Sequence, residues 1–130
     1  MAISACLVLF VALACGDNVD EVTTKLVEFE GSAQSGTATL TAIRPRTEIV
    51  LKVTPGPAED DPQPVHVHFG NCGINLGEVR APLTDLVAGE LTTVVDLDIT
   101  TLTDGSHNIN LHKSYPDIRV YTACGEISAP

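Results

Sequence analysis

The chain has 130 residues, of which 44% are hydrophobic, so it is long enough for one domain with a packed core. Aromatic residues make up only 4% and Trp is absent, which leaves Val, Leu, Ile and Ala to form that core. Seven basic residues against 17 acidic ones give a formal net charge of -10. This balance excludes nucleic acid as an expected partner, because phosphate binding needs clustered Lys and Arg.

The N-terminal segment has the features of a targeting sequence. Residues 2–15 carry no charge and are too few to span a bilayer, but they have the length of the apolar region of a signal peptide. The run ends in Ala12-Leu13-Ala14-Cys15, which resembles the cleavage box of a bacterial lipoprotein. We predict a signal peptide over 1–14, lipid attachment at Cys15 and a polar tether over 15–24. Plain secretion and a buried first strand are the alternatives.

This prediction places the chain outside the cytoplasm, in the periplasm or at the cell surface, or alternatively in the secreted fraction. Contact with a membrane is expected only through the N-terminal lipid anchor, and the sequence identifies no protein partner.

Residues 25–130 read as short β-rich runs separated by turn residues. Ala38, Leu40 and Ala42 alternate with threonines, as expected for a half-buried strand. The candidate strands are residues 25–31, 36–43, 47–54, 64–69, 77–83, 91–99, 106–112 and 119–127. About eight short strands at this spacing predict a single all-β domain, a Greek-key β-sandwich or flattened barrel of antiparallel strands.

Three histidines share a strand parity that suits a metal site. On the 64–69 strand, His66 and His68 face away from Val65 and Val67, and on the 106–112 strand His112 faces away from the apolar residues. A His-x-His pair with a third His from another strand would form a facial ligand set, and neutral imidazoles suit copper at least as well as zinc. An exposed pair that binds no ligand is the alternative.

Three further polar residues lie on the predicted 106–112 strand. Asn108 and Asn110 share the face of His112 and could orient the metal-binding rings as a second shell. His107 has the opposite parity and is interpreted as a structural residue at the start of the strand.

Two cysteines, Cys72 and Cys124, lie in the predicted β-domain. Outside the cytoplasm such a pair is expected to form a disulfide, with two unrelated thiols as the alternative. The bond would close a loop of roughly fifty residues and contribute about 4 kcal/mol in the chain-entropy model.

Together these residues resemble the copper/zinc superoxide dismutases. That family has a His-x-His strand, a Gly and a Cys in the next loop, a later Val-His strand, and a C-terminal Ala-Cys-Gly strand whose Cys pairs back to the loop. The bacterial chordin-like (CHRD) domains are similar in the strand around Asn110 and His112. The resemblance covers about residues 25–128, and the matching residues are His66, His68, Gly70, Cys72, His112, Ala123, Cys124 and Gly125.

The sequence also departs from the dismutases. It has no histidine between Cys72 and Ser106, where the family's bridging ligand and zinc ligands fall, so no zinc site of the dismutase type is expected. Tyr121 stands where the family places the Arg that guides superoxide, and Arg119 only partly replaces it. The leading hypothesis is therefore a copper-binding module without catalysis. A zinc-free copper dismutase and a structural or adhesive β-sandwich without metal are the alternatives.

Overall fold

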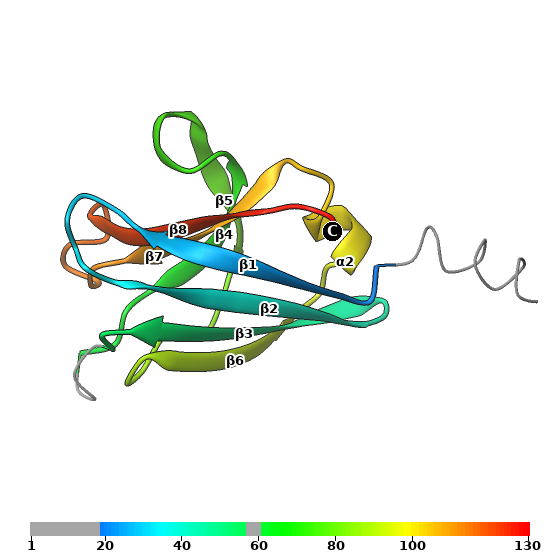
Figure 1. Ribbon diagram of the computed structural model, residues 1–130, viewed down its shortest axis with the longest axis horizontal. Coiled ribbons are helices and arrows are strands. Elements are labelled where there is room, and N and C mark those ends of the chain that lie inside the picture. The colour runs from blue at the N-terminus through cyan, green and yellow to red at the C-terminus, as the bar shows by residue number, and fades with distance from the viewer. Residues whose placement is uncertain (1–18, 57–60) are drawn as a thin grey trace, which may run out of the picture.

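The computed structural model describes residues 19–56 and 61–130, and these ranges are built almost entirely from β-structure (Figure 1). Their strands are β1 (Glu21–Glu28), β2 (Ser35–Ile43), β3 (Arg46–Thr54), β4 (Val65–Gly70), β5 (Leu76–Pro82), β6 (Glu90–Val95), β7 (His107–His112) and β8 (Tyr121–Ile127). A 3-10 turn, η1 (Gly73–Asn75), precedes β5, and a short helix, α2 (Ile99–Leu102), lies between β6 and β7. The predicted all-β class is confirmed.

The eight strands form one antiparallel sheet in the order β5-β4-β7-β8-β1-β2-β3-β6. Strand β1 belongs to both halves, because its first part pairs with β2 and its last residues, Val27 and Glu28, pair with β8. The sheet curls at this strand, so that the half containing β4, β7 and β8 crosses the half containing β2, β3 and β6 (Figure 1). This shape corresponds to the predicted flattened barrel.

The core lies between the two halves of the curled sheet and is made of alternating aliphatic residues. In β2 and β3, the inward positions Leu40, Ile49 and Leu51 are buried, while their neighbours are at least partly exposed, as the period of two requires. The other half contributes Val65, Val67, Ile109, Leu111 and Ile127, and helix α2 adds Ile99 and Leu102.

Strand β1 begins at Glu21, four residues before the predicted start. Val22 and Thr24 are buried with Leu26 on one face of the strand, and this alternation extends the strand toward the N-terminus. The predicted tether over 15–24 is therefore wrong for residues 21–24. The predicted signal peptide and Cys15 lie outside the described residues.

The predicted strand 91–99 is too long at its C-terminal end. Strand β6 ends at Val95, and Ile99 opens helix α2, because the side chain of Asp98 accepts a hydrogen bond from the Thr100 amide and caps the helix. Across residues 19–56 and 61–130, no helix has the length and apolar character needed to cross a membrane.

The predicted disulfide is present and ties the segment after β4 to β8. Cys72 and Cys124 have Cα atoms 5.9 Å apart and are separated by 52 residues in the chain. The segment turns at Gly70, whose φ of +86° favours glycine; a Cβ there would lie 2.0 Å from the carbonyl oxygen of Asn75. Cys72 follows the end of β4, the strand that carries His66 and His68, by two residues.

Replacing both bridged cysteines, Cys72→Ala with Cys124→Ala, should lower the free energy of unfolding by about 4 kcal/mol, because the unfolded chain regains the entropy of an open loop. Urea titration followed by circular dichroism measures this difference. The reducing agent dithiothreitol should destabilise the parent chain by a similar amount and leave the double variant unchanged. Equal stabilities of the two proteins would contradict the prediction.

Candidate metal centre

The pairing of β4 with β7 sets the positions of the three predicted metal-binding histidines. Val65 pairs with Leu111 and Val67 with Ile109, and all four of these side chains are fully buried in the core. His66 and His68 therefore project from the opposite face of the sheet, as the strand parity predicted.

His112 ends β7, where the pairing with β8 is irregular: Leu111 faces Ala123, but His112 faces Tyr121, so β8 carries one extra residue. Irregularities of this kind redirect a side chain. His112 lies beside the two histidines of β4, and its ring centroid is 4.5 Å from that of His66 and 5.7 Å from that of His68.

The three imidazoles form a cluster that could hold a metal ion. One ring nitrogen from each of His66, His68 and His112 lies within 4.8 Å of the other two. Three nitrogens that each lie about 2 Å from one ion are roughly 3–4 Å apart. The nitrogens therefore lie at most roughly 2 Å farther apart than they would around one ion.

Hydrogen bonds to the backbone determine which ring nitrogens are free in two of the histidines. Nδ1 of His68 lies 2.9 Å from the carbonyl oxygen of Gly77, and Nδ1 of His112 lies 2.6 Å from that of Ile118. A carbonyl only accepts, so Nδ1 carries a proton in both rings, and in the neutral form of each ring Nε2 keeps its lone pair. This second-shell bonding is typical of metal-binding histidines.

The free nitrogens are buried and have no partner. Nε2 of His68, Nε2 of His112 and Nδ1 of His66 make no hydrogen bond within the described part of the chain. A buried polar atom without a partner is costly, and in native proteins it calls for an explanation. An ion bound by all three would supply one.

Burial also favours the neutral form of two of the imidazoles, those of His112 and His66. Only 3% of His112 is exposed, and its pKa is lowered to about 4: burial is the main cause and the nearby His66 and His68 add to it, while the hydrogen bond to Ile118 opposes the shift. Burial lowers the pKa of His66 as well, with His68 adding to the effect and the carboxylate of Asp85 opposing it. Neutral imidazoles are the form that binds metal.

The remaining predicted residues surround the cluster without bonding to it. The side chain of Asn108 donates to the carbonyl oxygen of Gly70 at 2.9 Å, and the amide oxygen of Asn110 is buried without a partner. Among the described residues, no hydrogen bond joins either asparagine to a histidine ring. The predicted orienting role of these asparagines stays a prediction, and the bonds that do orient two rings come from Gly77 and Ile118.

His107 lies outside the cluster and begins β7, as predicted. Its side chain is buried, and Nδ1 lies 3.1 Å from the carboxylate of Asp104. This local contact gives His107 a structural role at the turn into the strand.

Two contacts that sequence reasoning did not predict shape the surroundings of the site. The ring of Tyr121 contacts that of His112 edge-on, with centroids 5.1 Å apart. Tyr115 donates to the carboxylate of Asp85 at 2.7 Å, which links the segment after β7 to the segment after β5. Neither contact has a local signal in the sequence: the first joins two neighbouring strands, β7 and β8, and the second joins two loops whose residues are 30 positions apart.

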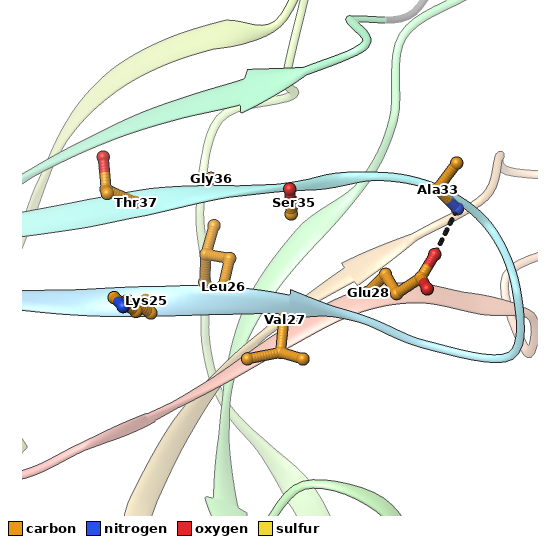
Figure 2. A pocket seen from close by; sticks show the side chains of 8 residues that line it. All are labelled: Lys25, Leu26, Val27, Glu28, Ala33, Ser35, Gly36 and Thr37. Carbon is orange, nitrogen blue, oxygen red and sulfur yellow. Dashed lines mark hydrogen bonds between the residues drawn. The ribbon is translucent and has the colours of Figure 1, made fainter.

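The surface hollow drawn in Figure 2 lies away from the histidines. It has a volume of about 620 Å³ and opens between β1 and β2, near the turn that joins them. The carboxylate of Glu28 accepts a hydrogen bond from the Ala33 amide at its rim, at 2.7 Å. None of the three clustered histidines lines this hollow.

Comparison with known proteins assigns no family to the chain. No protein-family model, curated protein or solved structure matches it. The functional argument therefore rests on the geometry of the cluster.

The depressed pKa of His112 predicts that the metal-free protein loses stability as the pH falls. Above pH 6.5, the ordinary pKa of His, both the folded and unfolded chains hold a neutral imidazole. Between 6.5 and about 4 only the unfolded chain takes up the proton, so the loss begins below 6.5 and is complete below about 4. We expect a decrease of about 3 kcal/mol over this window, measured by urea titration at each pH with a chelator present.

The variant His112→Asn is the control for this experiment, because it removes the titrating group. Its pH dependence should be flatter than that of the parent chain over the same window. Parallel pH profiles of the two proteins would contradict the assignment to His112.

Proposed function

We propose that this chain is an extracytoplasmic copper-binding domain whose ion is held by His66, His68 and His112. The observation that carries the proposal is the convergence of three buried, unpartnered imidazole nitrogens on one face of the sheet. In His68 and His112, a backbone carbonyl accepts the Nδ1 proton, which leaves Nε2 of the neutral ring available to a cation.

The ligand set supports copper. The cluster has three imidazoles and includes no thiolate or carboxylate among the described residues. Imidazole suits both copper and zinc, but copper(II) binds more tightly than zinc at a given nitrogen site. Three protein ligands would also leave a coordination position open for solvent or another small ligand.

The disulfide supports a location outside the cytoplasm. Bonds of this kind persist in oxidising compartments and are rare in reducing ones. The predicted signal peptide and lipid attachment at Cys15 provide a route to the periplasm or cell surface.

The resemblance to the copper/zinc superoxide dismutases and CHRD domains supports the same site. It supplies the order His66, His68, Cys72, His112 and Cys124, and the cysteine pairing that it implies is present. Tyr121 in place of the guiding Arg and a net charge of -10 disfavour rapid capture of an anion such as superoxide. Copper holding is therefore the proposed function, and dismutation is an outcome for the experiment to test.

The experiment is a copper(II) titration of the full chain followed by electron paramagnetic resonance. One equivalent of copper should give a single nitrogen-ligated signal. Each of His66→Ala, His68→Ala and His112→Ala should weaken binding by more than about 100-fold, since even second-shell changes cost 10–100-fold in affinity. A parallel zinc titration and a superoxide assay on the copper-loaded sample distinguish the metal and separate a carrier from an enzyme.

The variant His107→Gln is the matched control, because it changes a buried histidine outside the cluster. It should bind copper like the parent chain. Absence of stoichiometric copper binding, or equal losses in His107→Gln and the three cluster variants, would sink the proposal and leave a structural β-domain.

A further inference from the structure

Two buried glutamines form a reciprocal pair behind the histidine cluster. Gln34 comes from the turn between β1 and β2, and Gln63 lies just before β4; they are 8% and 4% exposed. Nε2 of each donates to Oε1 of the other at 2.9 Å. The second hydrogen of the Gln34 amide goes to the carbonyl oxygen of Pro55, also at 2.9 Å.

The pair is bonded directly to the backbone of His112. Nε2 of Gln63 donates to the His112 carbonyl oxygen at 3.0 Å, and the His112 amide donates to the Pro64 carbonyl oxygen at 2.9 Å. Both backbone groups of this histidine are therefore held by the segment that leads into β4, the strand of His66 and His68.

These bonds act where the sheet alone specifies the position of His112 least. The pairing of β7 with β8 shifts by one residue between Leu111 and His112. At such an irregularity the regular pattern of hydrogen bonds between strands is interrupted, so it no longer fixes the position of His112 relative to β8. The bonds from Gln63 and Pro64 fix His112 against β4 instead.

The chemistry of the pair also calls for an explanation. Two apolar side chains of similar shape would fill the same space, but they would leave the carbonyl oxygens of Pro55 and His112 without these donors. A fully bonded amide pair differs in allowing a single arrangement of the groups it joins. A hollow of about 370 Å³, lined by both glutamines and by Tyr121, lies next to the pair.

We propose that Gln63, held in orientation by Gln34, is a positioning residue that sets His112 at the distance from His66 and His68 needed to share one ion. The inference rests on the proposed metal-binding function. Gln63 touches the backbone of His112 and acts on the ion only through that residue.

The test compares Gln63→Met with two other variants of the full chain, using copper(II) as the probe. Gln63→Met keeps the length of the side chain and removes its bonds, so copper affinity should fall roughly 10–100-fold and the electron paramagnetic resonance signal should change. Gln34→Met leaves the bond from Gln63 to His112 in place and should cause a smaller loss.

Thr47→Val is the matched control. Thr47 is fully buried in β3, on the other half of the sheet, and its hydroxyl donates to the Leu97 carbonyl oxygen at 2.7 Å. The variant loses a buried side-chain bond to the backbone, as Gln63→Met does, but it should keep the copper affinity and spectrum of the parent chain.

A second measurement on the metal-free protein separates this inference from the proposed function. The Nδ1 proton of His112, bonded to Ile118, should exchange with solvent faster in Gln63→Met than in Thr47→Val, as followed by nuclear magnetic resonance. If the parent chain binds copper and Gln63→Met binds it equally tightly with the same spectrum, the inference is overturned. If the parent chain binds no copper, the proposed function fails, and unchanged exchange of the Nδ1 proton would overturn the positioning role too.

Discussion

The register between β4 and β7 is the constraint on which the site depends. A slip of one residue in either strand would exchange the two faces and send the histidines into the core. The buried cross-strand pairs Val65 with Leu111 and Val67 with Ile109 oppose such a slip, because each removes two aliphatic side chains from water. The same contacts that form the core therefore place the imidazoles on the opposite face.

Burial of that opposite face gives the cluster its chemistry. A histidine pair on an open sheet face would be hydrated and would titrate near its ordinary pKa. Here Gly77 and Ile118 bring backbone carbonyls against His68 and His112, which fixes each ring and leaves its Nε2 unprotonated. The cost is three buried nitrogens without hydrogen bonds, and binding an ion would offset it.

The sequence was sufficient to predict the strands, the shared face of His66, His68 and His112, and the Cys72–Cys124 pair, because these depend on local alternation or on few alternatives. It was not sufficient for the parts that depend on contacts between distant segments. The start of β1 depends on Val22 entering the core, and the choice of ring nitrogen depends on carbonyls whose positions no local pattern reveals. The resemblance to the dismutases supplied the order of the ligands, but it carried no information about the glutamines.

Two of the contacts that support the site join segments that are far apart in the chain. The disulfide links residues 52 positions apart, and the bond from Gln63 to the carbonyl oxygen of His112 spans 49. Such links restrain the relative motion of the strands that carry the histidines, so they limit the spread of the three imidazoles. A site built in this way is suited to holding an ion in a fixed geometry.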